Sequence, residues 1–463
     1  MAGVAAALLL GGCTSPDHAA VSRPDARVVA AAITEEGLRA RLEELAEATG
    51  AADGFRSVGS PGYDAAAALV ERELAAAGWS VHSDRHEDMA FVDDRRSSLA
   101  VEGQVFGVDD VRPLILAPGG DVTGPVVSLV PSAADVTGRG CRASEYGAIP
   151  SAAIVLVGPG DCLRREQVIA AQQAGAAAFV AVSHEASPGV VLRPTLLDPR
   201  GLAIPAAAVS QRAAKALLEA AAARGTAHLV TTARSEQVPS RTVLAELEGS
   251  RDGPVVMLGA HLDSVIDGPG VNDNASGVAG LLEVARALRG AHPQATVRLA
   301  FWSGEELGLH GSLRYVSALS PAEKQAIVVY ANVDMIASPN GFAGVYDEAN
   351  AAAGSSNATR LLIAAVRRNG GAPVPVDLHN GSDHYGFVEA GVVTAGVFSG
   401  SMDPVTPEQA AGSGVAAGQP ADRCYHQPCD DLSNVDLGVG RVLVAGLADF
   451  TVQVANSPEL LKP

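Results

Sequence analysis

Three apolar runs in the second half of the chain end in imidazole or carboxylate side chains. The runs and the residues that follow them are 254–260 with His261 and Asp263, 296–302 with Glu305 and Glu306, and 327–333 with Asp334. Runs of this length are typical of strands that are buried on both faces, as in a parallel sheet. Because the carboxyl ends of such strands open into one crevice, residues far apart in the sequence can meet there. The spacing therefore predicts one site built from all three strand ends.

The residue types predict a pair of metal ions at this site. Two zinc ions about 3.5 to 4 Å apart repel each other, and a carboxylate between them offsets the repulsion and fixes their spacing. We expect Asp273, in a loop before a predicted helix, to be this bridging ligand. His261 and Asp334 would complete the site of one ion, and Glu306 and His426 that of the other. The pattern therefore predicts two Zn²⁺ per chain.

Glu305 is expected to have a different role from Glu306, because adjacent residues at a strand end cannot both point at one metal. It is left free as the general base that takes a proton from the attacking water. Asp263, two residues after His261, is expected to accept the second N–H of that imidazole. Each of these residues alone would more often be structural, and only their combination indicates a two-metal hydrolase.

Other residues that could bind a metal or act as a nucleophile are weaker candidates. His310, His379 and His384 compete as metal ligands, and residues 382–384 are expected to form part of a pocket wall. The pattern Gly-x-Ser-x-Gly, which marks the serine nucleophile of α/β-hydrolases, does not occur in the sequence. Its absence disfavours a serine hydrolase.

The elements that must position the site form an α/β pattern. After about residue 236, strands, loops and helices alternate, and helices are also predicted over residues 35–48 and 64–77. We therefore expect a central mixed, mostly parallel sheet flanked by helices. Between residues 109 and 236, short apolar runs alternate with helical stretches, and no cluster of acidic residues with histidine occurs. This stretch is expected to be a smaller inserted α/β domain.

The inserted stretch resembles the protease-associated domain. The matching features are Cys141, an apolar strand over residues 152–157, Gly158, Cys162 and the run Ala174-Gly175-Ala176. The expected division is residues 1–13 as a lipoprotein signal, 14–33 as a tether, 34–108 and 237–457 as the two parts of a zinc peptidase domain, and 109–236 as the insert.

The second half resembles the secreted dinuclear zinc aminopeptidases of the bacterial leucine aminopeptidase type. The matching stretches are residues 260–264, 272–273, 305–308, 334–336, 424–426, 429–430 and 432–434. The resemblance implies an exo-aminopeptidase that releases N-terminal residues from peptides, with the metal and base roles given above. It also implies that Tyr425 donates a hydrogen bond to the tetrahedral oxyanion. Residues 59–62 are similar to the family's N-terminal segment, whereas Gly381 stands where members often carry an arginine.

Two other classes stay open at this point. One is a related metal-dependent amidohydrolase or carboxypeptidase, and the other is a catalytically inactive binding protein that keeps the fold. Activity on peptides with free amines, compared with N-acylated ones, would discriminate the hydrolases.

Composition excludes other classes of protein. The chain has 463 residues, of which 48% are apolar and 18% charged, so it is long enough for two or three globular domains. Lys and Arg total 33 against 52 Asp and Glu, which gives a net charge of -19. Such a surface repels phosphate backbones, and a nucleic-acid partner is therefore not expected.

The cysteines and the N-terminal segment predict export. Residues 1–12 are apolar and far shorter than a membrane span, and Leu10-Gly11-Gly12-Cys13 resembles the bacterial lipobox. A lipid on Cys13 would be the only contact with a membrane, holding the protein on the outer face of the cell. A signal peptide that happens to contain cysteine, with secretion, is the alternative. The other cysteines form two local pairs that predict disulfides rather than a four-cysteine zinc site, namely Cys141–Cys162 and Cys424–Cys429.

Overall fold

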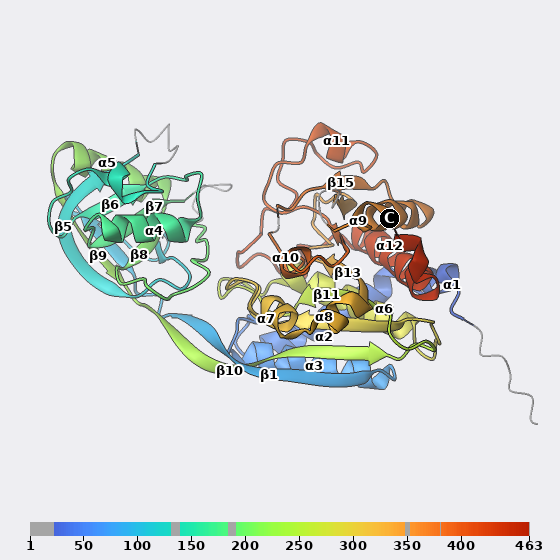
Figure 1. The fold of residues 1–463 in the computed structure, drawn as a ribbon. Coiled ribbons are helices and arrows are strands. Elements are labelled where there is room, and N and C mark those ends of the chain that lie inside the picture. The colour runs from blue at the N-terminus through green and yellow to red at the C-terminus, as the bar shows by residue number, and fades with distance from the viewer. Residues whose placement is uncertain (1–22, 131–138, 184–190, 348–351, 380, 463) are drawn as a thin grey trace, which may run out of the picture.

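The computed structural model describes residues 23–130, 139–183, 191–347, 352–379 and 381–462. The chain forms two lobes that are joined by two long strands, β1 (Ser80–Asp93) and β10 (Ala233–Leu247), which pair along their whole length in antiparallel register (Figure 1). The chain leaves the larger lobe along β1 and returns along β10. The smaller lobe is therefore an insertion into the larger one.

The larger lobe is built on a mixed sheet of eight strands in the order β1-β10-β12-β11-β13-β16-β14-β15. Four of its seven neighbouring pairs are parallel, including all those among β11, β12, β13 and β16. Besides β1 and β10, its strands are β11 (Val255–His261), β12 (Thr296–Trp302), β13 (Ile327–Val333), β14 (Gly344–Tyr346), β15 (Val374–Val376) and β16 (Thr394–Phe398). The predicted central sheet is confirmed.

Helices cover both faces of this sheet, which explains why β11 is apolar throughout. Val256 and Leu258 pack into the cluster that contains α12, whereas Met257 points to the opposite face and packs with Phe387 of α10. Helix α12 packs on α1, α2, α6 and α9, and 72% of its most apolar segment is buried, as expected of a core helix. The helices of this lobe are α1 (Ala26–Ala31), α2 (Glu35–Gly50), α3 (Pro61–Ala76), α6 (Gly277–Ala287), α7 (His310–Ala318), α8 (Pro321–Ala326), α9 (Ser355–Arg368), α10 (Tyr385–Glu389), α11 (Pro407–Ala410) and α12 (Leu437–Asn456), with the short turns η2 (Val271–Ser276) and η3 (Pro458–Leu461).

The smaller lobe has its own eight-stranded sheet, in the order β3-β2-β9-β5-β6-β7-β8-β4, and the helices α4 and α5. It begins earlier than the predicted boundary at residue 109, because residues 98–106 already pair within it. Its elements are β2 (Ser98–Val101), β3 (Gln104–Phe106), β4 (Val111–Pro113), β5 (Gly120–Ser128), η1 (Ala143–Tyr146), β6 (Ile154–Val157), α4 (Arg164–Gln173), β7 (Ala178–Val182), β8 (Ala206–Val209), α5 (Gln211–Ala222) and β9 (Thr226–Thr231).

The segment that precedes α2 differs from the predicted tether over residues 14–33. Residues 26–31 form α1, whose N-terminus is capped by the Asp25 carboxylate, and Val29 and Ala30 are buried. An amphipathic turn of this kind is too short to give a sustained periodic signal in the sequence. The predicted signal segment and Cys13 lie outside the described residues.

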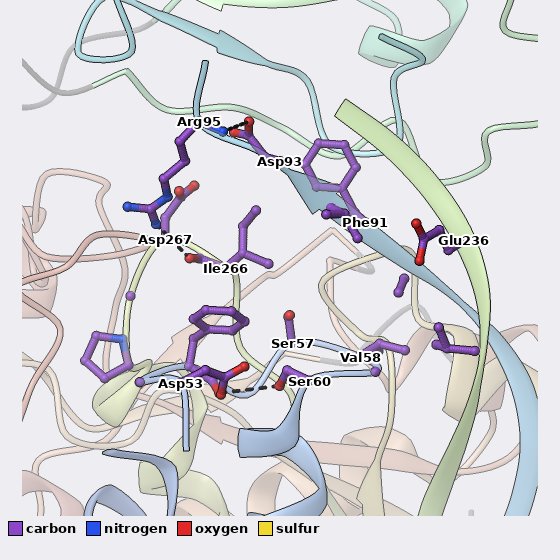
Figure 2. A pocket seen from close by; sticks show the side chains of 18 of the residues that line it. Asp53, Ser57, Val58, Ser60, Phe91, Asp93, Arg95, Glu236, Ile266 and Asp267 are labelled. Carbon is purple, nitrogen blue, oxygen red and sulfur yellow. Dashed lines mark hydrogen bonds between the residues drawn. The ribbon is translucent and has the colours of Figure 1, made fainter. Parts of the chain in front are cut away.

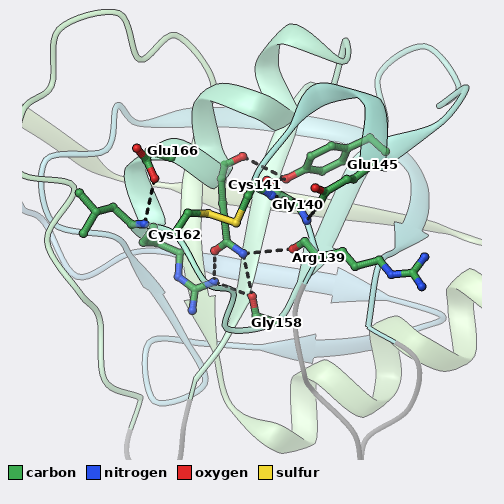
Figure 3. The surroundings of a disulfide bond; sticks show 11 residues. Arg139, Gly140, Cys141, Glu145, Gly158, Cys162 and Glu166 are labelled. Carbon is green, nitrogen blue, oxygen red and sulfur yellow. Dashed lines mark hydrogen bonds between the residues drawn. A yellow bond between two sulfur atoms is a disulfide. The ribbon is translucent and has the colours of Figure 1, made fainter.

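Both predicted disulfides are present. Cys141 is joined to Cys162 in the smaller lobe, and Cys424 is joined to Cys429 in the larger one. Around the first bridge, the buried Gln167 amide donates to the carbonyls of Arg139 and Gly158, each at 3.1 Å (Figure 3). The bridge and this amide together hold the loops on either side of β6.

Candidate active site

The five predicted metal ligands lie together at the carboxyl ends of β11, β12 and β13. His261 is the last residue of β11, Asp334 directly follows β13, and Asp273 lies in η2 between β11 and α6. Glu306 follows β12, and His426 comes from the loop that the Cys424–Cys429 bridge closes. Topology therefore brings together residues that are up to 165 positions apart (261 to 426) in the sequence.

Asp273 lies between the two halves of the cluster. Its Oδ1 is 3.2 Å from His261 Nε2, which is also 3.3 Å from Asp334 Oδ1. Its Oδ2 is 3.1 Å from His426 Nε2, which is 3.0 Å from Glu306 Oε2. Each carboxylate oxygen of Asp273 thus faces a different histidine and a different acidic partner.

The donor set suits zinc. The potential ligand atoms of His261, Asp273 and Asp334 lie within 4.8 Å of one another, and so do those of Asp273, Glu306 and His426. The second oxygen of Glu306, Oε1, is buried and has no hydrogen-bond partner among the described residues. A buried carboxylate oxygen without a partner is costly unless a cation satisfies it. Imidazole nitrogens and carboxylate oxygens are the ligands of catalytic zinc sites.

Glu305 differs from Glu306 in its surroundings. A ligand atom of Glu305 groups with His261 and Glu306, but Glu305 belongs to neither of the two groups around Asp273. Burial raises the pKa of Glu305 well above its usual range, the imidazole of His261 opposes this shift, and the carboxylate of Glu306 adds to it. A carboxylate with a raised pKa is suited to take up and return a proton near neutral pH.

Asp263 supports the site in a way that the sequence did not predict. The His261 Nδ1 atom lies 3.1 Å from the main-chain carbonyl of Asp263, and 3.8 Å from its carboxylate. The carboxylate instead accepts the backbone N–H groups of Glu305 and Glu306 at 3.1 and 3.2 Å. The turn after β11 therefore uses one residue to orient the imidazole and to fix the loop that carries both glutamates.

Two further residues, Arg56 and Asp430, support the site through contacts with the main chain. The buried Arg56 donates to the main-chain carbonyls of Leu262 and Gly270 at 2.9 and 2.8 Å, holding the loop between His261 and Asp273. Asp430 accepts the backbone N–H of Asp273 at 3.1 Å. Nothing in the sequence singles out Arg56, because its side-chain hydrogen bonds in the described structure go to main-chain carbonyls. Asp430 lies in the matching stretch 429–430, but its contact with Asp273 depends on the fold.

Tyr425 and Ser382 lie at the edge of the cluster. The Tyr425 ring stacks on His426 with 3.8 Å between the ring centroids. Burial, and next the carboxylate of Asp273, raise the pKa of the Tyr425 phenol well above its usual range, so this group stays protonated and can donate. The Ser382 hydroxyl donates to Asp334 Oδ2 at 2.7 Å, which fixes the oxygen that faces away from His261.

The three competing histidines belong to none of the metal-binding groups found in the described part of the chain. His310 Nδ1 is 2.6 Å from a carboxylate oxygen of Asp88 on β1. His384 is buried, and burial lowers its pKa to about 4. His379 lines the cavity above the cluster.

Two adjoining cavities open onto the cluster, and Glu305, Glu306 and His426 line both of them. The smaller, of about 250 Å³, lies within the larger lobe and is lined in part by Met335 and Phe398. The larger, of about 850 Å³, is shared between the two lobes. It is lined by Leu192 and Leu197 of the insert and by Leu309, which follows Glu305 and Glu306 in the larger lobe. The inserted domain therefore forms one wall of the approach to the site.

A third cavity, of about 590 Å³, lies where the connecting strands meet the larger lobe (Figure 2). Its lining includes Phe91 and Asp93 of β1, Ser57, and Asp267 from the loop between His261 and Asp273. It contains none of the metal-binding groups identified among the described residues. The candidate site is therefore the cluster around Asp273.

Comparison with known proteins identifies the family. The chain is 32% identical over 481 aligned positions to the "Probable lipoprotein aminopeptidase LpqL" of Mycobacterium tuberculosis, covering 98% of this chain and 94% of that protein. Residues 242–450 match peptidase family M28. The chain belongs to peptidase family M28. In this M28 peptidase, residues 122–217 also match the PA domain, which confirms the predicted insert.

Other relatives agree with this assignment. An "Aminopeptidase" of Pseudomonas aeruginosa is 33% identical, covering 86% of this chain and 76% of its own. The fold is similar to that of the aminopeptidase from Aneurinibacillus sp. strain AM-1, with a TM-score of 0.75, 22% identity and coverage of 93% of this chain and 96% of that one. The predicted enzyme class, a metal-dependent aminopeptidase, is confirmed by these matches to the M28 family and its aminopeptidases.

Proposed function

We propose that this M28 peptidase holds two Zn²⁺ and removes single residues from the free N-termini of peptides. The observation that carries this proposal is the position of Asp273, whose two carboxylate oxygens face different ligand pairs. One ion would be held by His261 and Asp334 and the other by Glu306 and His426, with Asp273 shared. When bound, two zinc ions lower the pKa of the attacking water and polarise the scissile carbonyl.

The chain's own residues supply the rest of the chemistry. Glu305 takes the proton of the attacking water and delivers it to the leaving amine. The protonated phenol of Tyr425 donates to the oxygen on which negative charge develops. The free amine of the substrate needs acceptors, which Glu305 and the Ser382-bound oxygen of Asp334 supply without the arginine that Gly381 replaces.

The test compares substrates that differ only in the amine. Leucyl p-nitroanilide should be hydrolysed with a kcat/KM at least about 100-fold above that of its N-acetyl form, because acetylation removes the charge and adds bulk. Comparable rates on the two substrates would instead favour an amidohydrolase. Hydrolysis restricted to C-terminal residues of longer peptides would favour a carboxypeptidase, and no hydrolysis by zinc-loaded protein would favour a binding role.

We also propose that the protein is exported and anchored by a lipid on Cys13. Two disulfides support an oxidising compartment, and the first-named relative is described as a lipoprotein. Replacing Cys13 by serine should move the protein from the membrane fraction to the medium or block its processing. An unchanged distribution would show that there is no anchor.

A further inference from the structure

The smaller cavity beside the cluster carries negative charge that the metal site does not use. Beyond the five proposed ligands, Glu305 and Tyr425, its lining contains Asp377 and Asp403, and no lysine or arginine. Asp377 follows β15, and Asp403 lies in the loop after β16. Neither belongs to any of the metal-binding groups identified in the described residues.

The negative charges of Asp377 and Asp403 are not balanced by lysine or arginine in the described residues. Asp377 is 3.2 Å from Nδ1 of His379, a side chain that is 86% exposed, and it has no ion pair with lysine or arginine among the described residues. Asp403 is exposed, and the structure records no ion pair for it within the described ranges. Two zinc ions would offset the charge of the four carboxylates around them, and Asp377 and Asp403 would keep theirs. Negative charge at the mouth of a concave site attracts cationic groups.

The size of the two cavities indicates which end of the substrate enters this one. A volume of about 250 Å³ accommodates a single side chain, whereas the 850 Å³ cavity shared with the insert offers room for the rest of a peptide. An exopeptidase holds the N-terminal residue of its substrate in a pocket of limited size, and the smaller cavity fits that role. Met335 and Phe398 give that cavity apolar walls along which an aliphatic stem can lie while a terminal charge reaches a carboxylate.

We propose that Asp377 and Asp403 make this enzyme select N-terminal residues with a cationic side chain, lysine or arginine, over apolar ones. The proposal rests on the aminopeptidase function given above. Asp377 and Asp403 are exposed, so a long side chain held in the cavity can reach them beside Leu378 and Ser401 of its lining.

The test measures kcat/KM on lysyl and leucyl p-nitroanilides with the full-length, zinc-loaded protein. The wild-type protein should prefer the lysyl substrate. The double variant Asp377→Asn, Asp403→Asn should lower the lysyl-to-leucyl ratio at least about tenfold, as expected for loss of a charge pair at a partly exposed site. A matched control is Asp252→Asn, an exposed aspartate just before β11 at the opposite end of that strand from His261. It should leave the ratio within about twofold, since its charge is remote.

Several outcomes would overturn the proposal. Unchanged kcat/KM on both substrates in the double variant would show that the carboxylates do not contact the side chain. An equal loss on both substrates would show that they act on the free amine or on the metal site instead. If the wild-type protein hydrolyses neither substrate, the aminopeptidase function itself fails, whereas good leucyl activity without a lysyl preference refutes only the selectivity.

Discussion

Two adjacent glutamates after β12 face different partners, and the proposed function assigns metal binding to one of them and catalysis to the other. Glu306 lies 3.0 Å from His426 and belongs to the group around Asp273. Glu305 lies outside that group, although Asp263 holds the backbone N–H groups of both residues. A shared anchor of this kind lets one loop present the proposed ligand and the proposed base in fixed relative positions.

Substitution of Glu305 by glutamine should separate the two roles. Glutamine keeps the shape of the side chain but cannot take a proton, so kcat should fall roughly 10² to 10⁴-fold while zinc content is retained. Glu306→Gln is the matched control, and it should lower zinc content itself. The measurement pairs steady-state kinetics with zinc analysis of the purified proteins. Loss of zinc in Glu305→Gln to the same extent as in Glu306→Gln would contradict the division.

At the residue scale, the sequence predicts the groups that carry charge but not those that hold them. His261, Asp273 and Asp334 have types and positions that point to metal binding. Arg56 could not be predicted, and the resemblance that includes Asp430 does not give its contact with Asp273, because the partners are carbonyl and N–H groups that every residue carries. Their positions depend on tertiary contacts across more than 150 residues (56 to 262, 430 to 273).

Among the elements, the loop closed by the Cys424–Cys429 bridge contributes most directly to the site. It contains both Tyr425 and His426, and His426 has a left-handed backbone conformation with φ of 59°. A non-glycine residue in that region is strained by about 1 kcal/mol or more and needs its surroundings to hold it there. The short covalent ring supplies that restraint.

Opening this ring should damage the site more than the fold. On the chain-entropy model, the double variant Cys424→Ser, Cys429→Ser should lose about 2 kcal/mol of the free energy of unfolding. It should also lose activity and one zinc, because Tyr425 and His426 lie inside the ring. The matched control is Cys141→Ser, Cys162→Ser in the smaller lobe, which should retain both zinc ions. Circular dichroism, zinc analysis and kinetics provide the measurements. Full activity and zinc content in the first double variant would show that the bridge is idle.

A contact between Asp88 and His310 links β1 to the start of α7. Burial lowers the pKa of His310, but the hydrogen bond and the charge of Asp88 outweigh it and raise the pKa above its usual range. A raised pKa means that the contact stabilises the fold fully below about pH 6.5, the ordinary value for histidine. This stability is then lost as pH rises through the folded-state pKa.

The His310 contact is testable by titration. In Asp88→Asn, the pKa of His310, measured by NMR, should fall below that of the wild-type protein because the opposing charge is gone and burial remains. The gain in stability on lowering the pH from 8 to 6 should shrink in the same variant. An unchanged His310 pKa would show that the ion pair does not form in solution.

The elements differ in how well the sequence predicts them. β11, β12 and β13 are predicted because helices cover both faces of the sheet, which favours mostly apolar strands; in β12 only Thr296 and Arg298 depart from this. The 14-residue β1 and 15-residue β10 are not predicted, because they are mostly polar and only partly buried. They are strands because they pair with each other along 14 residues, and β10 pairs with β12 as well over residues 243–247.

In the whole molecule, Arg193 connects the inserted domain to the metal-binding loop. Its guanidinium makes two hydrogen bonds of 2.8 Å to Asp267, which lies between His261 and Asp273, and one of 2.7 Å to Asp93 at the end of β1. The Arg193 side chain is only 2% exposed. The wall that the insert contributes to the larger cavity is therefore fixed to the same loop that carries the bridging ligand.

Removing the buried charge of Arg193 should lower the free energy of unfolding far more than removing an exposed charge. Arg193→Met should lower the free energy of unfolding by about 3–5 kcal/mol, because the buried carboxylate of Asp93 loses its ion pair and that of Asp267 keeps only the one with Arg112. The control is Arg200→Met, whose side chain is 88% exposed and pairs with Asp198, and which should cost under about 1 kcal/mol. Urea unfolding followed by fluorescence measures both. Similar losses in the two variants would show that the connection between the lobes contributes no special stability.

The shared carboxylate of Asp273 is the centre of the proposed site, and zinc stoichiometry tests it most directly. The wild-type protein, freed of loosely bound metal, should contain about two zinc ions per chain, and activity restored to the metal-free protein should reach its maximum at the second equivalent. Asp273→Asn should lower zinc content and activity together, because one carboxylate serves both ions. A wild-type chain that is fully active with one zinc, or an Asp273→Asn variant that keeps two, would contradict the two-metal site.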